Sequence, residues 1–238
     1  TPSGLHFERH HQGWWDIDPS KHRLMINGLV KRQRVFTMDD LMRLPSVSRI
    51  HFIECGANSA PEWGNVALPS VQYTHGMVSC SEFTGVLLST LLEMCGYDKK
   101  NGKYVLAEGA DGSSMTRTID IDRAMDDCIV AWAMNGEMLR PENGYPLRLV
   151  VPGVQGVSWV KYLRRIEVGD QKWATKDEAV HYIDHMPDGT HRQYTGIQEC
   201  KSVITTPSGS QTLLDKGYYN ITGLAWSGRG EVKRVDVS

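Results

Sequence analysis

The shortness of its regular segments is the feature that most constrains how this sequence can fold. Residues 22–30 alternate apolar and polar side chains as a strand does, whereas residues 85–96 have the apolar spacing of an amphipathic helix. Gly and Pro, which number 23 and 10 in 238 residues, interrupt such segments along the chain. Because short strands and helices are mixed, we expect an α+β fold and not a doubly wound sheet.

The composition divides the chain into three parts. Residues 1–170 hold mixed strands and helices and are expected to form the main domain. Residues 171–196 are polar and irregular, which predicts a linker or crossing segment. Residues 197–238 alternate in short runs separated by Gly and Ser, which is typical of a β-sandwich. Since residues 234–238 read as a strand with no turn after it, we expect a truncated sandwich in a piece of a longer protein.

Charge and hydropathy exclude several classes of protein. A net charge of −2 gives no reason to expect nucleic acid or an anionic membrane as the main partner. No apolar run approaches the roughly 20 residues that cross a bilayer. The 5 cysteines are odd in number and form no C-x-x-C pair, so neither a disulfide framework nor a finger-type zinc site is expected.

Cys55 stands at the end of a segment, residues 49–55, that reads as a strand. Gly56, Ala57 and Asn58 then break the strand pattern, so the thiol is expected beside small and polar residues. A lone cysteine is most often a buried apolar side chain. A thiolate is also a good nucleophile and a soft metal ligand. The residues around Cys55 leave all three roles open.

Several other segments combine cations with flexible backbone. Arg9 is flanked by histidines, and such a group either binds an oxyanion or forms a solvated surface. The Gly-containing loops 108–114 and 152–161 follow predicted strands but match no dinucleotide or P-loop pattern. A loop that closes on Lys161 suits a phosphate. Arg148 is a charge within an apolar strand, where it either reaches solvent or points at a bound anion.

Together these segments resemble the sulfite-oxidase-type molybdenum enzymes over nearly the whole chain. The matching motifs, in the order of the family, are F-E-R-H-H (7–11), E-C-G-A-N (54–58), A-E-G-A-D (107–111), A-W-A-M-N-G-E-M-L (131–139) and G-Y-P-L-R-L-V-V-P-G-V-Q-G-V-S-W-V-K-Y-L (144–163). The segment 225–238 resembles the opening of the family's Ig-like dimerisation domain. Within the family, residues 53–65, 74–86 and 140–170 are most similar to the molybdenum subunit of sulfane dehydrogenases, the SoxC type.

The resemblance implies molybdenum bound by one molybdopterin. The fold it implies is an α+β domain of the sulfite-oxidase type followed by a truncated Ig-like β-sandwich. Cys55 would be the thiolate ligand of the metal, Arg9 would lie near the substrate oxyanion, and Trp132 takes the position of a family tyrosine near the metal; these are the catalytic candidates. The implied cofactor-binding residues are Phe7, Glu8, Arg9, His10, His11, Asp111, Asn143, Arg148, Trp159, Val160 and Lys161.

Several positions depart from the family pattern. Ser59 and Ala60 stand where sulfite oxidases carry arginines, Asn143 replaces a histidine, and Phe83 replaces a tryptophan. Trp132 replaces the tyrosine already mentioned. Fewer cations and a missing phenol favour a less charged sulfur substrate, presented on a carrier protein, over free sulfite.

The expected activity is molybdenum-dependent oxidation of carrier-bound sulfane sulfur, such as a protein-cysteine persulfide, toward sulfonate. Oxygen-atom transfer at molybdenum would do the chemistry, and a cytochrome c partner subunit, which carries the haem, would take the electrons. The resemblance also implies a homodimer through the Ig-like domain and a periplasmic location, with the export signal outside this chain. The alternatives are a cytochrome-linked sulfite dehydrogenase or sulfite oxidase, and a cofactor-free binding or assembly remnant.

Overall fold

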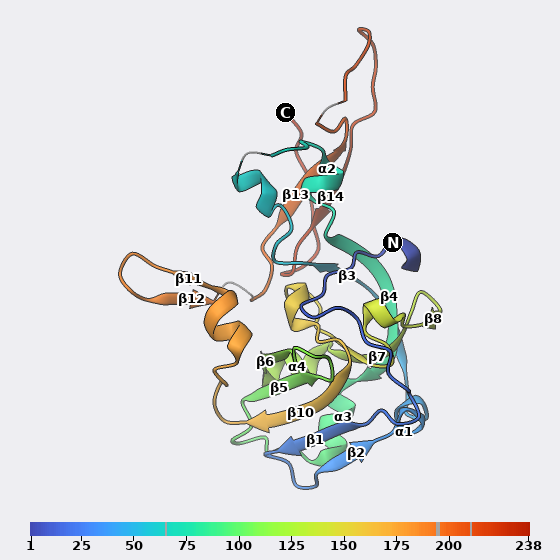
Figure 1. Cartoon of the computed structure of the whole chain (residues 1–238), viewed down its shortest axis with the longest axis vertical. Coiled ribbons are helices and arrows are strands. Elements are labelled where there is room, and N and C mark those ends of the chain that lie inside the picture. Colours follow the sequence, from blue (N-terminus) through green and yellow to red (C-terminus); the bar gives the residue numbers. More distant parts are fainter. Residues whose placement is uncertain (65, 194–195, 210) are drawn as a thin grey trace.

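Two five-stranded sheets form the main body of the protein, and two hairpins project from it (Figure 1). The structure, a computed structural model, describes residues 1–64, 66–193, 196–209 and 211–238. Strands and short helices are mixed along the chain, which confirms the α+β class.

The first sheet pairs the start of the chain with its middle. Its strands, in spatial order, are β2 (Arg34–Phe36), β1 (Leu24–Gly28), β10 (Leu163–Gly169), β5 (Tyr104–Gly109) and β6 (Thr116–Asp120). Strands β1 and β10 are parallel, with Met25 opposite Arg165, and the other pairs are antiparallel. In β1 the alternating side chains Leu24 and Ile26 are fully buried, so the predicted period of two places them in the core.

The second sheet is antiparallel throughout. Its strands are β3 (Val47–Glu54), β4 (Val78–Leu87), β7 (Ile129–Met134) and β8 (Glu137–Met138), and β9 (Arg148–Val150) pairs with β7. The hairpin β7–β8 turns at Asn135 and Gly136, both with positive φ, as the Asn-Gly signal predicts. Strand β3 ends at Glu54, so Cys55 is the first residue beyond the strand, as the sequence predicts.

The helices are short and begin and end at recognisable signals. They are α1 (Met38–Met42), α2 (Val71–Thr74), α3 (Leu88–Cys95) and α4 (Ile121–Asp126), with 3-10 turns at Ser3–Leu5, Ala60–Trp63, Pro141–Asn143 and Gly156–Ser158. Thr37 caps α1, because its hydroxyl oxygen accepts from the Asp40 N–H while the Asp40 carboxylate accepts from the Thr37 N–H. Gly96, with a φ of 64°, ends α3.

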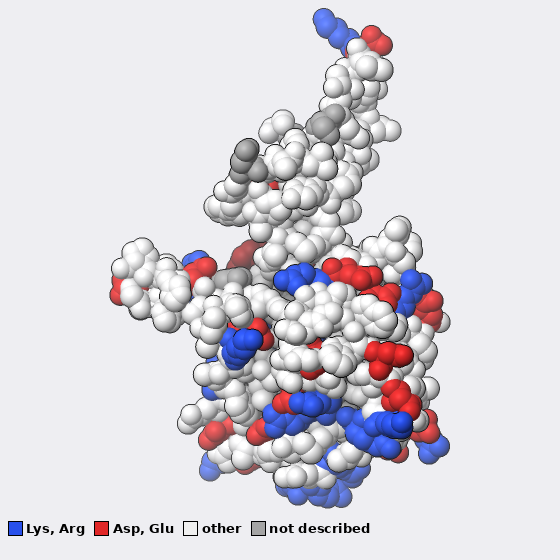
Figure 2. Space-filling model, in the orientation of Figure 1, with Lys and Arg blue, Asp and Glu red and all other residues white. Residues whose placement is uncertain are grey.

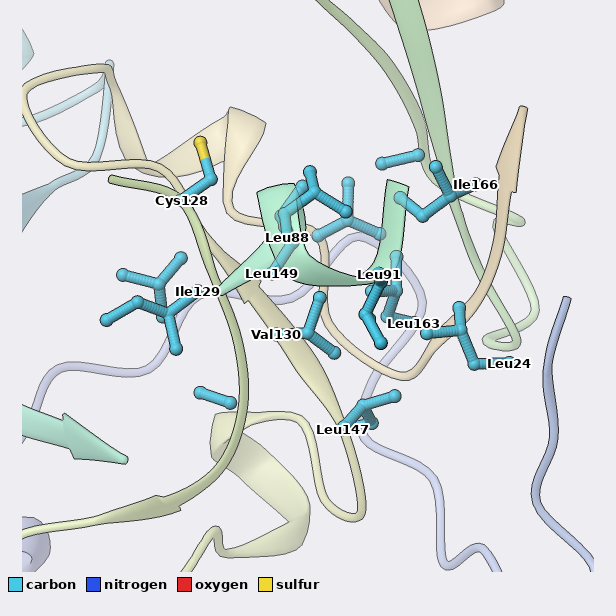
Figure 3. Close-up of a cluster of buried hydrophobic side chains, with 14 of the residues drawn as sticks. Leu24, Leu88, Leu91, Cys128, Ile129, Val130, Leu147, Leu149, Leu163 and Ile166 are labelled. Carbon is cyan, nitrogen blue, oxygen red and sulfur yellow. The ribbon is translucent and has the colours of Figure 1, made fainter. Parts of the chain in front are cut away.

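The core lies where α3 meets both sheets (Figure 3). Leu88 and Leu91 of α3 are fully buried among apolar side chains from the two sheets. The side chains around them in the view are Leu24, Leu163 and Ile166 from the first sheet and Ile129, Val130 and Leu149 from the second. This packing holds the ends of β3, β5 and β9 in fixed relation, and those ends carry the candidate site.

The segment 171–196 is more structured than the predicted irregular linker. Its described residues form a π-helix at Asp177–His181 and a hairpin of β11 (Ile183–His185) and β12 (His191–Gln193). Glu178 fixes the π-helix to β6, because its carboxylate accepts hydrogen bonds of 2.9 Å from both the N–H and the hydroxyl of Thr118. A polar segment with no periodicity gives no sign of such a tertiary anchor, and the assignment of residues 171–196 as a linker or crossing segment stays a prediction.

The C-terminal part forms one small sheet. Strands β13 (Lys201–Thr206) and β14 (Thr222–Trp226) pair antiparallel, and among the described residues after 196 they make the whole sheet. Residues 234–238, predicted as a strand, are irregular. A sandwich needs two packed sheets, so the Ig-like domain and the three predicted domain boundaries stay predictions.

Figure 2 shows how charge is distributed on one face of the molecule. Charged side chains gather over the main body, whereas the extension that contains β13 and β14 is largely uncharged up to its tip. In the part of the chain that the structure describes, no helix has the length and hydropathy to cross a membrane.

Candidate active site

One cavity brings most of the predicted site residues together. It encloses about 750 Å³ including its open mouth. Its walls are the N-terminal segment, the end of β3, the loop after β5, the turn before β9 together with the start of β9, and the segment that follows β9. The predicted residues that line it are Phe7, Arg9, His10, His11, Cys55, Asp111, Asn143, Arg148, Trp159, Val160 and Lys161. Five segments that are distant in the sequence therefore meet at one place.

Cys55 presents a free, half-buried thiol to this cavity. Its N–H donates to the carbonyl oxygen of Met77 at 3.0 Å, and its own carbonyl accepts from the N–H of Asn58 at 2.9 Å. The backbone therefore leaves the sheet in a tight turn directly after β3. This turn exposes the thiol, whereas a cysteine one position earlier would lie within the strand.

Arg148 is a buried cation on β9, with 3% of its surface exposed. It donates to the carbonyl oxygens of Asn143 at 2.9 Å and Trp159 at 3.3 Å. Its guanidinium carbon lies 5.7 Å from the ring centre of Phe83 and 5.9 Å from that of Trp159. Among the described residues no carboxylate lies within ion-pair distance of Arg148, and its Nε atom has no hydrogen-bond partner. Burial lowers its pKa to about 10.

Lys161 supplies a second cation from the adjacent wall. Its Nζ atom lies 2.8 Å from Nδ1 of His10 and donates to the carbonyl oxygens of Arg9 and Glu142 at 3.2 and 3.0 Å. Burial, together with the charge of Arg148, lowers the pKa of Lys161 to about 7. A bound anion would reverse this shift, because it favours the charged form of the lysine.

The two Gly-containing loops singled out in the sequence pack against each other. The N–H of Ala110 donates to the carbonyl oxygen of Tyr162 at 2.8 Å, and a Cβ on Gly109 would lie 2.7 Å from the carbonyl oxygen of Lys161. Asp111 fixes the first loop, since its carboxylate accepts from the Ser113 hydroxyl at 2.6 Å and from the N–H of Met115, directly before β6, at 3.2 Å. This arrangement turns Asp111 into the cavity.

Two of the predicted residues lie outside the cavity lining. Glu8 is exposed, but its carboxylate lies 3.4 Å from Nε2 of His10 and so contacts a residue of the lining. Trp132 is buried on β7. Ala131 pairs with Arg148 and shares its face of the sheet, so the neighbouring Trp132 points to the opposite face. The predicted catalytic role of Trp132 therefore has no support from its position.

Tyr182 is a cavity residue that the sequence did not reveal. It follows the π-helix, and its hydroxyl lies 3.3 Å from Nε2 of His11. The guanidinium carbon of Arg117 stands 5.2 Å from its ring centre. Burial, and then the charge of Cys55, raise the pKa of Tyr182. The phenol belongs to the polar segment 171–196, where no motif or periodicity marks it.

His6 also lines the cavity and is held neutral. Its Nδ1 lies 3.1 Å from the hydroxyl of Ser81, and its ring stacks on Phe7 with centres 5.6 Å apart. Burial, followed by the charge of Arg148, lowers the pKa of His6 to about 3. His6 therefore offers hydrogen bonds and ring surface to a ligand, while the cationic charge comes from the arginines and Lys161.

The donors in this cavity fit a molybdopterin. Arg148 has a buried Nε and Asn143 has a buried side-chain oxygen, both without a partner among the described residues, and both residues line the cavity. Such atoms are available as hydrogen-bond partners for the polar groups of a ligand. The described residues contain no group of three or more His, Cys, Asp or Glu that could hold a metal ion. A metal here would take one soft ligand, Cys55, from the protein and its other ligands from a bound cofactor.

Comparison with known proteins agrees with this fit. The family described as "oxidoreductase molybdopterin binding domain" matches residues 11–176. The NADPH nitrate reductase of Phytophthora infestans is 34% identical over the whole chain, which covers 30% of that protein. Human mitochondrial sulfite oxidase is 31% identical over the whole chain, which covers 47% of it. The chain belongs to this molybdopterin-binding oxidoreductase family, so the resemblance to sulfite-oxidase-type enzymes is confirmed.

One solved structure is much more similar. The crystal structure of the sulfane dehydrogenase SoxCD from Paracoccus pantotrophus matches with a TM-score of 0.92 and 47% sequence identity. The match covers 97% of this chain and 59% of that one. The chain thus spans less than two thirds of each relative named here.

Proposed function

We propose that this chain is the molybdenum-binding part of an enzyme that oxidises carrier-bound sulfane sulfur toward sulfonate. The observation that carries the proposal is the distribution of cations in the cavity. Arg148 and Lys161 are withdrawn into its walls, so that among the described arginines and lysines of the lining Arg9 is the exposed one. Ser59 and Ala60 are uncharged and lie outside the lining. One exposed arginine suits a substrate with little charge of its own better than a free dianion.

In this proposal one residue of the chain binds the metal, and a separate group of residues binds the pterin and its phosphate. Cys55 would bind molybdenum through its thiolate. Arg148, Lys161 and Asn143 would bind the pterin and its phosphate, because they offer one buried cation, one half-buried cation and an amide oxygen without a partner among the described residues. The bound molybdopterin would supply oxygen-atom transfer to sulfur together with the two-electron redox change. The remaining cofactor-binding candidates are Phe7, Glu8, His10, His11, Asp111, Trp159 and Val160.

The mouth of the cavity would receive the substrate. Arg9 would bind the oxygens that form as the sulfur is oxidised, since guanidinium donates to sulfur oxyanions. His11 and Tyr182 lie 3.3 Å apart at the same wall and would orient the sulfur group by hydrogen bonding. Trp132 remains a weaker candidate, because it lies outside the lining.

The proposed partners are a cytochrome c subunit that carries haem, a sulfur-carrier protein as the substrate, and a second copy of the chain. Support for the dimer comes from the C-terminal extension, which exposes apolar side chains where charge is scarce (Figure 2). These side chains are Ile204, Leu213, Leu214, Tyr218, Ile221 and Leu224. A periplasmic location completes the proposal, since the carrier and the cytochrome would be met there.

A substrate comparison tests the proposal. The cofactor-loaded protein, with cytochrome c as acceptor, should turn over a carrier protein bearing a cysteine-bound sulfane and should respond weakly to free sulfite. The unloaded carrier is the control. Fast turnover of sulfite with no response to the loaded carrier would favour the second candidate, a sulfite dehydrogenase. That candidate is supported by the 31% identity to human sulfite oxidase over the whole chain.

A further inference from the structure

Glu54 lies directly before Cys55 and is a buried carboxylate, 5% exposed. Its Oε1 atom accepts from the side chains of Asn58 at 2.9 Å and Lys201 at 2.7 Å. Its Oε2 atom accepts from Gln198 at 2.9 Å and from the indole N–H of Trp226 at 2.7 Å. An ionised carboxylate has about four acceptor sites, so these donors saturate it.

Asn58 connects this carboxylate to the turn that presents the thiol. Its side-chain amide donates to Glu54, and its side-chain oxygen accepts from the N–H of Met77 at 3.0 Å. Its backbone N–H closes the turn by donating to the carbonyl oxygen of Cys55. The position of the Cys55 turn is therefore fixed on one side by Met77, directly before β4, and on the other by Glu54.

The other donors to Glu54 come from the C-terminal part of the chain. Lys201 and Trp226 face each other across β13 and β14, where they pair in register. Lys201 also donates to the hydroxyl of Ser59 at 3.0 Å, one residue beyond the Cys55 turn. The small C-terminal sheet thus contacts the segment that carries Cys55 through Glu54 and Ser59.

The same C-terminal part contacts the opposite wall. The N–H of Gln198 donates to the carbonyl oxygen of Gly153 at 2.9 Å, and the N–H of Gly228 donates to that of Gln198 at 2.9 Å. Next to Gly153, the carbonyl oxygen of Val154 accepts from the indole N–H of the cavity residue Trp159 at 2.9 Å. Both walls of the cavity are therefore braced by residues after 196.

We infer that Glu54 is a positioning residue for Cys55, and that the C-terminal sheet is part of the active-site machinery and not only an oligomerisation unit. Removing a donor would leave a buried carboxylate short of partners, and the Cys55 turn would shift to regain them. The role of Cys55 as the metal ligand rests on the proposed function. The positioning itself is a property of the protein without cofactor.

The test is alkylation of Cys55 by iodoacetamide in the full-length chain without cofactor, followed residue by residue by mass spectrometry. Trp226→Phe removes the indole N–H and keeps an aromatic ring. It should raise the rate at Cys55 about tenfold relative to Cys80, which is exposed and serves as an internal reference. Buried Cys95 reports global opening and should stay unreactive. Trp173→Phe, the same change on a half-buried indole elsewhere, should leave Cys55 unchanged.

A second pair of variants separates positioning from general stability. Glu54→Leu should raise the Cys55 rate as Trp226→Phe does, whereas Glu54→Gln keeps an acceptor oxygen and should restore most of the protection. An unchanged Cys55 rate in both Trp226→Phe and Glu54→Leu would overturn the inference. Equal increases at Cys55 and Cys95 would overturn it too, because they would report global unfolding.

The loaded protein distinguishes this inference from the proposed function. In the cofactor-loaded protein, Trp226→Phe should lower kcat, because the Cys55 turn shifts. KM for the sulfur substrate should stay unchanged, because the substitution does not alter Arg9 at the mouth of the cavity. If the wild-type protein produced in a cofactor-supplying host holds no molybdenum but the alkylation result stands, the proposed function fails and the positioning survives. If turnover is normal and Cys55 alkylation never responds, only the positioning fails.

Discussion

The Nζ atom of Lys161 lies 2.8 Å from Nδ1 of His10, and this contact joins two segments that are 151 residues apart in the chain. It holds the N-terminal segment against the wall formed by the loop before β10. Because the same lysine is buried near Arg148, its pKa falls to about 7. The contact that closes the cavity is thus also sensitive to pH.

Lys161 should make the stability of the cofactor-free protein rise with pH. Its pKa is about 7 in the folded state and near 10.4 when unfolded, so between these values the unfolded chain binds more protons. Its contribution to the unfolding free energy should therefore increase from pH 7 to pH 9. Urea denaturation of wild type and Lys161→Met at both pH values measures it. Equal pH dependence in the two proteins would contradict the assignment.

Replacement by Met should change the stability of the protein little at Arg148 and lower it strongly at Arg117. Arg148 has no carboxylate partner among the described residues, so Arg148→Met removes an uncompensated buried charge, which offsets the loss of its hydrogen bonds to Asn143 and Trp159. The stability of the cofactor-free protein should therefore change by less than about 1 kcal/mol, while molybdopterin retention is abolished. Arg117 is buried and is paired at 3.8 Å with Glu178, whose side chain is 8% exposed, so Arg117→Met should cost roughly 3 kcal/mol of unfolding free energy. Chemical denaturation and pterin fluorescence measure the two effects. A large loss of stability in Arg148→Met would mean that this arginine is structural.

Cys55→Ser should remove turnover and leave the fold intact. A hydroxyl is a poor replacement for a thiolate ligand, and the half-buried side chain changes by one atom, so the stability should stay within about 1 kcal/mol of wild type. Steady-state assay, circular dichroism and elemental analysis for molybdenum check the three expectations. Cys80→Ser, at an exposed thiol, is the matched control. Near-normal turnover in Cys55→Ser would show that another cysteine binds the metal.

Tyr182→Phe should lower kcat/KM for the sulfur substrate by up to about tenfold, the effect of losing one hydrogen bond. The hydroxyl lies 3.3 Å from His11 at the cavity wall, and the ring would stay in place over Arg117. Steady-state kinetics of the loaded protein measure the change. Tyr73→Phe, at an exposed tyrosine outside the cavity lining, should have no effect. Identical kinetics of wild type and Tyr182→Phe would remove Tyr182 from the site.

Much of the site could be predicted because it is built on turns. Cys55 and Asp111 each come shortly after a strand and stand beside glycines, while Lys161 closes the Gly-containing segment that leads into β10. These local signals are present in the sequence itself. The order of the motifs then indicated that separate turns belong to one site, and the cavity brings them together.

The rest depends on tertiary pairing that no local pattern records. The face of a side chain on β7 follows from its register with β9, and this register turns Trp132 away from Arg148. Tyr182 reaches the cavity only because Glu178 anchors a polar segment to β6. Lys201 and Trp226 donate hydrogen bonds to Glu54, from which they are separated in the sequence by 147 and 172 residues.

The parallel pairing of β1 with β10 also has a consequence for synthesis of the chain. Strand β10 lies between the β1–β2 hairpin and the β5–β6 hairpin, so the first sheet cannot close until residues 163–169 have left the ribosome. At roughly 5–20 residues per second, β1 would wait on the order of ten seconds with one edge unpaired. We expect ribosome-bound chains arrested before β10 to be cleaved readily by protease and those arrested well after it to resist. An edge left open this long is a natural binding site for a holding chaperone.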